Sequence, residues 1–163
     1  AANTDLKFIR DDLYRRITTG TLQPVLDDLV LAKRMNIWLE VTHLIIPALN
    51  DSTSDLRQLC RWMYENLGPD TPLHFSRFYP QYLMKNLPET PVSTLEAAYD
   101  IAKETGLRYV YVGNVWGGKY ENTYCPNDDT LLIGRTGYRI MENNITADGT
   151  CPKCGTAIPG VWR

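Results

Sequence analysis

The chain has 163 residues, 44% of them hydrophobic, which is enough to bury a core in one domain or in one domain with a small appendage. A formal charge of −2 with mixed signs leaves no basic face of the kind that phosphate backbones need, so we expect no nucleic-acid partner. The sequence has neither an apolar run of membrane length nor an export signal, so we expect no membrane association and a cytoplasmic protein.

Four apolar segments of strand character alternate with three segments of helical periodicity. The strand segments are Ala1–Phe8, Ile37–Pro47, Leu73–Tyr79 and Tyr109–Gly113. The helical segments are Thr21–Met35, a segment from a cap at Ser52 to about Leu67, and one that Thr90 and Pro91 open and Gly106 closes. This order predicts right-handed crossovers and therefore a parallel sheet. Because the chain has no initial Met and starts with a strand pattern, we expect a piece of a longer polypeptide.

The segment Ile37–Pro47 is predicted to be a central strand that is covered on both faces. Alternation places Glu40 and Thr42 on one side of it and Val41 and His43 on the other. Burying a carboxylate in such a strand costs several kcal/mol of free energy unless the group is paired or hydrated, on the order of magnitude known for buried charges. Glu40 is therefore expected to face a partner or a polar cavity. The alternative is that Glu40 only pairs with a neighbouring Lys or Arg.

Polar side chains occur at or near the carboxyl ends of all four predicted strands. They are Asp5 and Lys7, Glu40 and Thr42, Ser76 and Arg77, and Asn114. Ligands of parallel sheets bind at these ends, so the sequence predicts one shared polar pocket. Asp5 and Lys7 share a face about 7 Å apart along the strand, a spacing suited to a zwitterionic ligand. The alternative for these two residues is a structural ion pair.

Residues 120–163 are predicted to form hairpins in a small ribbon-like tail, separate from residues 1–119. Cys151, Cys154 and the Gly that follows form a C-x-x-C-G turn, which is typical of a zinc or iron knuckle. In a second such turn, beginning at Cys125, Asp128 stands where the second Cys belongs and Asp129 where the Gly would be.

Two interpretations of the tail remain open. Either Cys125, Asp128, Cys151 and Cys154 bind a metal ion such as zinc, or the tail has lost the ion and is held by packing. The packing residues would be Tyr124, Leu132, Tyr138, Ile140 and Trp162. The remaining cysteine, Cys60, lies on the apolar side of a predicted helix and is expected to be a buried structural thiol.

Several motifs along the chain resemble one family when they are taken together. They are DLK at Asp5 to Lys7, LIIPALND, HFSRFYP, YVYVGNV, NTYCP and CPKCG, and they span essentially the whole sequence. The chain resembles the carboxyl-terminal half of radical SAM proteins of the AmmeMemoRadiSam system, relatives of pyruvate formate-lyase activating enzyme. The resemblance implies an α/β fold, with half of a (β/α)6 barrel followed by the cysteine tail.

The resemblance also implies cofactors and a reaction. Such enzymes bind S-adenosylmethionine and a 4Fe-4S cluster, cleave the former to a 5′-deoxyadenosyl radical and act on a partner protein or a small molecule. By position, Asp5 corresponds to a residue at a monovalent cation beside the cofactor carboxylate, whereas Lys7 and Thr42 correspond to cofactor contacts. Tyr79 stands where relatives tend to have His, so an adenine contact is expected to differ.

The C-x-x-x-C-x-x-C loop that holds the cluster in such enzymes is absent from these 163 residues. We therefore expect the parent protein to be an enzyme and this piece alone to be inactive in radical generation. The alternative is a non-catalytic βα module whose metal-binding tail recruits a partner protein. A cluster motif encoded upstream of Ala1 would favour the enzyme.

Overall fold

The structure is a computed structural model that describes residues 1–115 and 119–162. It divides into two compact units, Ala1–Asn114 and Val115–Arg163. The boundary predicted from sequence, between residues 119 and 120, lies next to positions 116–118, which are outside the described residues, and it stays a prediction. Within the described ranges, none of the helices is long and apolar enough to cross a membrane.

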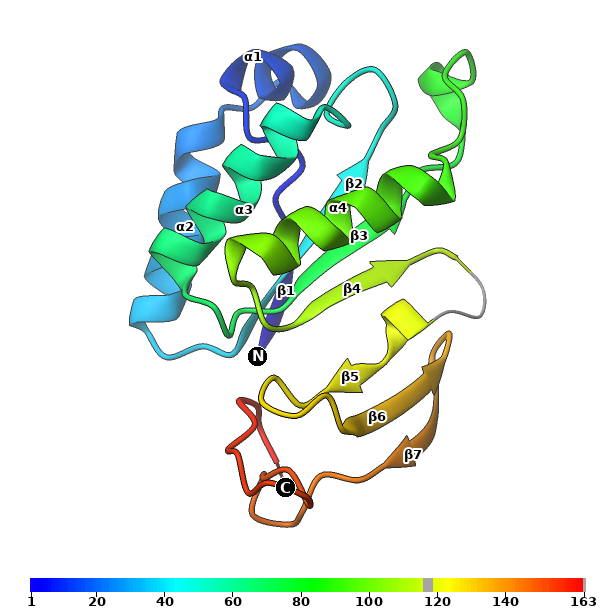
Figure 1. Ribbon diagram of the computed structural model, residues 1–163. Coiled ribbons are helices and arrows are strands. Elements are labelled where there is room, and N and C mark those ends of the chain that lie inside the picture. Colours follow the sequence, from blue (N-terminus) through cyan, green and yellow to red (C-terminus); the bar gives the residue numbers. More distant parts are fainter. Residues whose placement is uncertain (116–118, 163) are drawn as a thin grey trace. The chain divides into compact units, whose positions relative to one another are not determined.

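The first unit is built on a four-stranded parallel sheet with the order β1-β2-β3-β4 (Figure 1). Helices link consecutive strands, and this confirms the predicted alternation of strand and helix. The elements are β1 (Ala2–Asp5), α1 (Asp11–Leu13), the π-helical turn η1 (Tyr14–Thr18), α2 (Leu22–Arg34), β2 (Leu39–Ile45), α3 (Thr53–Leu67), β3 (Leu73–Arg77), η2 (Tyr82–Met84), α4 (Val92–Thr105) and β4 (Val110–Gly113).

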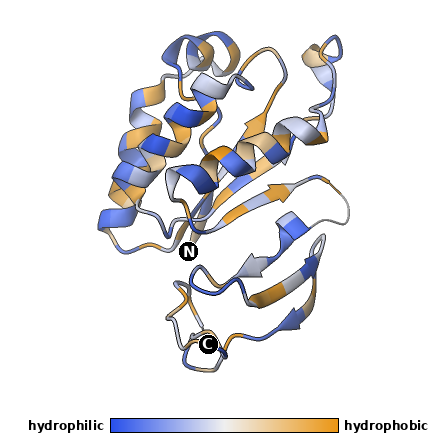
Figure 2. Ribbon diagram, viewed as in Figure 1, coloured by the Kyte–Doolittle hydropathy of each residue, from blue (hydrophilic) through white to orange (hydrophobic). Residues whose placement is uncertain are grey.

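The two faces of this sheet differ in character. Along β2, the side chains of Leu39, Val41, His43 and Ile45 are buried, whereas those between them are half-buried. The buried set packs toward α2, α3 and α4, which cover one face of the sheet (Figure 1). Hydrophilic and hydrophobic residues alternate along these helices, as expected when one side of each helix is in a core (Figure 2). The predicted alternation along the central strand is therefore confirmed.

Helix α3 shows how local sequence sets the bounds of an element. The Ser52 hydroxyl accepts a hydrogen bond of 3.1 Å from the backbone N–H of Asp55, and Gly68 ends the helix with a φ of 87°. The apolar side of the helix, which includes Cys60, is buried. Burial raises the pKa of the Cys60 thiol to about 12, so this cysteine is an unreactive core residue, as predicted.

The strands β1 and β2 are shorter than predicted. After Asp5 the chain leaves the sheet, because Leu6 and Phe8 turn into the core and Phe8 packs edge-on against Tyr14 with ring centroids 5.7 Å apart. The turns α1 and η1, which follow, were missed from sequence. Strand β2 ends at Ile45 because the backbone N–H of Ile46 bonds to the side chain of Asn50 instead of to a neighbouring strand.

The second unit contains a small antiparallel sheet with the order β5-β6-β7. Its elements are η3 (Lys119–Glu121), β5 (Thr123–Tyr124), β6 (Leu131–Thr136) and β7 (Arg139–Asn143). Strands β6 and β7 form a hairpin, and a turn with Gly149 at a φ of 73° precedes a bridge between Thr150 and Ala157. The predicted hairpins and the turn at Asp148 and Gly149 are confirmed.

We expect the free energy of unfolding to decrease as pH falls from about 6.5 to about 4, because of His43. This imidazole is buried on β2, and desolvation lowers its pKa to about 4. In that window the unfolded chain takes up a proton that the folded chain does not. Stability from the neutral ring is therefore complete above pH 6.5 and is lost toward pH 4, by up to about 3 kcal/mol.

Urea unfolding at pH 7 and pH 4.5 measures this effect. The variant His43→Gln has no titrating ring at this position, so its free energy of unfolding should depend less on pH across the same window. The same dependence in both proteins would show that His43 is not responsible.

Candidate functional site

The carboxyl ends of β1 to β4 meet at one edge of the parallel sheet (Figure 1). At the end of β1, the Lys7 ammonium lies 2.7 Å from the Asp5 carboxylate, and both side chains are about half exposed. The backbone of Lys7 is fixed on two sides: its N–H donates to the Tyr14 hydroxyl, and its carbonyl accepts from the Asn50 amide. The pair is thus a half-exposed ion pair on a backbone that is hydrogen-bonded on both sides.

Thr42 lies beside Asp5 in the strand register. Its hydroxyl donates a hydrogen bond of 3.0 Å to the side chain of Asn3, on the face of the sheet that is turned away from α2, α3 and α4. The structure therefore brings together three of the residues predicted for the cofactor pocket, Asp5, Lys7 and Thr42.

A second polar group connects the ends of β3 and β4. Arg77 donates to the hydroxyl of Tyr79, which donates to the backbone carbonyl of Asn114. The Asn114 amide in turn donates to Ser76 at 2.9 Å. Ser76, Arg77 and Tyr79 are thus linked through one hydrogen-bonded chain, although they come from both sides of β3.

The guanidinium of Arg77 points to the other face of β3 from Ser76. It donates to the carbonyl of Thr90 at 2.8 Å, pairs with Glu89 at 2.9 Å and lies over the Tyr79 ring. These contacts attach the segment before α4 to the sheet. Arg77 therefore stabilises the fold at this position. A contact between Arg77 and a cofactor stays a prediction.

Glu40 lies nearer the amino end of β2 than the other predicted residues. One carboxylate oxygen accepts a hydrogen bond from the indole of Trp38 at 3.1 Å, and the other lies 2.7 Å from Nε2 of His74. Glu40 thus faces a partner, as expected, and the partners shown are Trp38 and His74. The pairing depends on a diagonal contact between β2 and β3, which sequence alone did not reveal.

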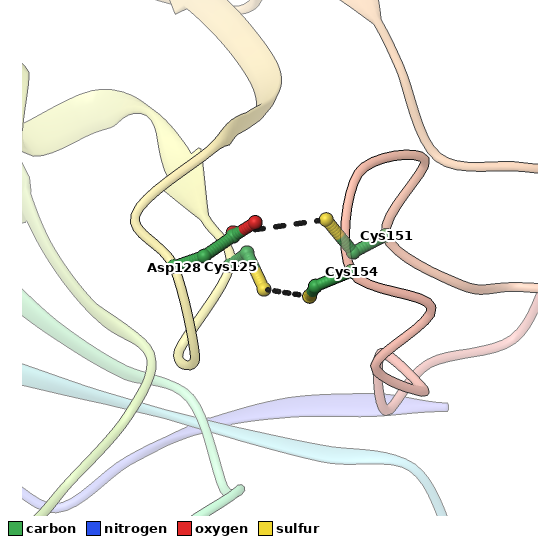
Figure 3. A group of neighbouring side chains, drawn as sticks. All are labelled: Cys125, Asp128, Cys151 and Cys154. Carbon is green, nitrogen blue, oxygen red and sulfur yellow. Dashed lines mark hydrogen bonds between the residues drawn. The ribbon is translucent and has the colours of Figure 1, made fainter.

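The second unit brings the predicted metal ligands together (Figure 3). The ligand atoms of Cys125, Asp128, Cys151 and Cys154 all lie within 4.8 Å of one another. The sulfurs of Cys125 and Cys154 are 3.6 Å apart, and an Asp128 oxygen is 3.8 Å from the sulfur of Cys151. Zn–S bonds of about 2.3 Å in a tetrahedron place sulfurs about 3.8 Å apart, so these separations suit one central ion.

Two turns of the same construction supply the ligands. In each, a cysteine carbonyl accepts from the N–H four residues later, and the cysteine N–H donates to the carbonyl five residues later. The first turn runs from Cys125 to Thr130 and the second from Cys151 to Thr156. Asp129 has a positive φ of 56°, and Gly155 has one of 71° at the same position of the second turn. This agrees with the prediction from sequence that Asp129 stands where the Gly would be.

The protonation of these groups differs from one ligand to the next. Burial raises the pKa of the Asp128 carboxyl, but hydrogen bonds from Cys125 and Thr130 outweigh it and lower the pKa to about 2. Hydrogen bonds from Thr156 lower the pKa of Cys154 to about 7, whereas burial raises that of Cys125 to about 11. The second oxygen of Asp128 is buried and has no hydrogen-bond partner among the described residues; the Lys153 ammonium is 3.8 Å away.

The apolar residues of the tail do not all behave as the packing alternative requires. Leu132 is buried, but Tyr138 and Ile140 are largely exposed. The side chain of Trp162 contacts Gly149 and Gly160 and donates to the carbonyl of Ile158. Binding of a metal by the four ligands stays a prediction, and the geometry favours it over packing alone.

The chain was compared with protein-family models, with curated proteins and with solved structures. No family model matches it. An uncharacterized protein of Methanocaldococcus jannaschii is 45% identical over 159 residues, which are 97% of this chain and 47% of that protein. The chain thus spans about half the length of this curated relative.

Two solved structures match part of this chain. A domain of pyruvate-formate lyase-activating enzyme from Bacteroides vulgatus matches with a TM-score of 0.59 and 10% identity, over 69% of this chain and 66% of that domain. A radical SAM methyltransferase from Sphaerobacter thermophilus matches with a TM-score of 0.49 and 17% identity, over 68% of this chain and 32% of that one. Together with the parallel sheet, the first likeness confirms the predicted fold class, a partial barrel of the radical SAM type.

Proposed function

We propose that this chain is the carboxyl-terminal part of a radical SAM enzyme of the AmmeMemoRadiSam type, similar to pyruvate formate-lyase activating enzyme. The observation that carries the proposal is the Asp5–Lys7 pair, at the carboxyl edge of a sheet whose fold resembles that of an activating-enzyme domain. In this proposal the parent protein cleaves S-adenosylmethionine reductively and acts on an unknown protein or small molecule.

The methionine part of S-adenosylmethionine carries both an ammonium and a carboxylate. Asp5 and Lys7 offer the opposite charges 2.7 Å apart. A half-exposed ion pair contributes only about 0–1 kcal/mol to stability, so a zwitterion can replace it at little cost. Thr42, next to Asp5 in register, supports a further contact, and Glu40, Ser76 and Tyr79 are proposed to contact the cofactor along the same edge.

The cysteines of this chain do not fit a 4Fe-4S cluster. Cys60 is buried in α3, and the other three lie with Asp128 around a space for one ion. We propose that the cluster ligands belong to a part of the polypeptide outside this chain, which spans 47% of its relative. The cluster supplies the electron that cleaves the cofactor, so this chain alone should not cleave it.

We expect Asp5→Ala to weaken binding of S-adenosylmethionine about tenfold, because the ammonium of the ligand loses its carboxylate partner. Equilibrium dialysis on the intact polypeptide, reconstituted with iron and sulfide, measures the affinity. The control is Asp28→Ala, which removes an exposed carboxylate from α2. Equal affinities of Asp5→Ala and Asp28→Ala would contradict the assigned role of Asp5.

The same reconstituted protein provides the test of the enzymatic function. With dithionite it should convert S-adenosylmethionine to 5′-deoxyadenosine, and no turnover from a fully loaded cluster would overturn the proposal. The alternative, a non-catalytic module with a metal-binding tail, predicts no binding of the cofactor at all.

We also propose that Cys125, Asp128, Cys151 and Cys154 hold one structural zinc ion. The spacing of the four ligand atoms, all within 4.8 Å of one another, and the buried oxygen of Asp128 that has no hydrogen bond among the described residues support this proposal. Four protein ligands leave no open position for a substrate, so the centre would stabilise the tail and take no part in catalysis.

A further inference from the structure

The face of the sheet turned away from α2, α3 and α4 carries an ordered pair of titratable side chains, Glu40 on β2 and His74 on β3. Nε2 of His74 lies 2.7 Å from one carboxylate oxygen of Glu40. The indole N–H of Trp38 bonds to the other oxygen, and the ring of Tyr111 stacks on His74 at 4.9 Å with an interplanar angle of 22°. Both partners are thus held in orientation by aromatic neighbours.

The hydrogen bond determines which nitrogen of His74 is basic. An ionised carboxylate can only accept, so Nε2 carries the hydrogen and the neutral ring keeps its lone pair on Nδ1. Among the described residues, none has a hydrogen bond with Nδ1 of His74. His43 has the opposite arrangement, since its Nδ1 lies 2.6 Å from the carbonyl of Leu6, which also can only accept.

A purely structural role explains this pair poorly. The two side chains keep 33% and 30% of their surface exposed, and an exposed pair of this kind adds little to stability. What the carboxylate does provide is a fixed tautomer and a fixed ring orientation, as a positioned proton acceptor requires.

The position of the pair connects it to the proposed cofactor edge. Thr42 is in register with both Asp5 and His74 and points to the same face. Glu40 and Thr42 are successive residues of that face, about 7 Å apart along the strand. A substrate that reaches the radical at the edge would therefore extend along the strands toward His74.

We propose that Nδ1 of His74, positioned by Glu40, accepts a proton from an O–H or N–H group of the substrate. The O–H or N–H bond breaks heterolytically, its electron pair stays on the substrate, and the proton forms a new bond to Nδ1. The hydrogen bond from Nε2–H to Glu40 holds the resulting imidazolium in place. Only a proton is transferred in this step, so no oxidant or reductant is needed. The location of the substrate rests on the proposed function. The lone pair on Nδ1 follows from the hydrogen bond to Glu40 and does not depend on that function.

Two measurements on the 163-residue chain, without cofactor, test the pair. Nitrogen-15 NMR of the neutral rings should show the Nε2–H tautomer for His74 and the Nδ1–H tautomer for His43; with two histidines in the chain, each serves as the reference for the other. Diethyl pyrocarbonate, which acylates the free lone pair of a neutral imidazole, should modify His74 at Nδ1 and spare the buried His43.

The variant Glu40→Gln separates a positioned base from a passive contact. It keeps the size of the side chain but removes its charge, so the plateau rate of acylation at high pH should fall about fivefold. The control, Glu65→Gln on the exposed side of α3, makes the same change of charge and should react at the rate of the unmodified chain. An Nδ1–H tautomer for His74, or equal rates with Glu40 and Gln, would overturn the proposal.

The outcome is independent of the proposed function. Loss of cofactor binding in equilibrium dialysis would contradict the radical SAM assignment and leave the acylation result intact. Failure of the acylation test would contradict the role of His74 and leave cofactor binding intact.

Discussion

Replacing Cys151 with Ser should release the metal from the second unit and unfold that unit. The purified chain should contain about one zinc ion, and Cys151→Ser should contain almost none, because three ligands do not close the tetrahedron. A structural zinc ion supplies on the order of 10 kcal/mol to a small module, so backbone amides of residues 119–162 should lose their protection from hydrogen exchange. Metal analysis and hydrogen-exchange mass spectrometry measure the two effects.

Two further variants serve as controls for this result. Cys60→Ala removes a buried thiol from α3 and should keep the full zinc content, because Cys60 is not among the four ligands. Asp128→Cys should bind zinc more tightly than the natural sequence, since thiolate is the softer ligand. A metal-free chain, or equal zinc in Cys151→Ser and Cys60→Ala, would contradict the assignment.

Asn50→Ala should destabilise the first unit by about 4 kcal/mol, because it leaves several buried polar groups unpaired. The buried amide of Asn50 donates to the carbonyls of Lys7 and Leu44, and its oxygen accepts from the N–H of Ile46 at 2.7 Å. The amide nitrogen also lies 3.3 Å from Nε2 of His43. This side chain thus joins the ends of β1 and β2 at the proposed cofactor edge.

Urea unfolding of the intact chain measures the loss, with Asn66→Ala as the matched control. Asn66 is exposed near the end of α3, and among the described residues its side chain bonds to the carbonyl of Trp62 alone, so its replacement should change stability by less than about 0.5 kcal/mol. If both substitutions cost the same, the network around Asn50 is not what holds the strand ends together.

The fold could be predicted from sequence because its local signals agree with its tertiary contacts. Strand and helix periodicities alternate, and the predicted helix ends at Asn36, Gly68 and Gly106 have the left-handed φ values of 55°, 87° and 102°. Turns α1 and η1 escaped detection because residues 10–16 are dominated by charge and a π-helical turn does not follow the period of 3.6 residues.

The sequence predicted the residues of the metal site but not all residues of the site at the edge of the sheet. The metal ligands were found because the C-x-x-C spacing is local, and its incomplete copy at Cys125 could be aligned with it. The roles of Asn50 and His74 were missed, since both depend on which residues of neighbouring strands lie opposite each other. Polar residues that alternate on one face of successive strands were the only signal for His74.

The repeated turn construction of the second unit has a consequence for chain entropy. Asp128 and Cys151 are 23 residues apart, and the β6–β7 hairpin lies between them. An ion held by both turns closes this loop as a cross-link, and a cross-link over such a length removes about 3 kcal/mol of unfolded-state entropy in the loop-closure model. The ion would therefore act like a disulfide that forms without oxidation and that a chelator can open.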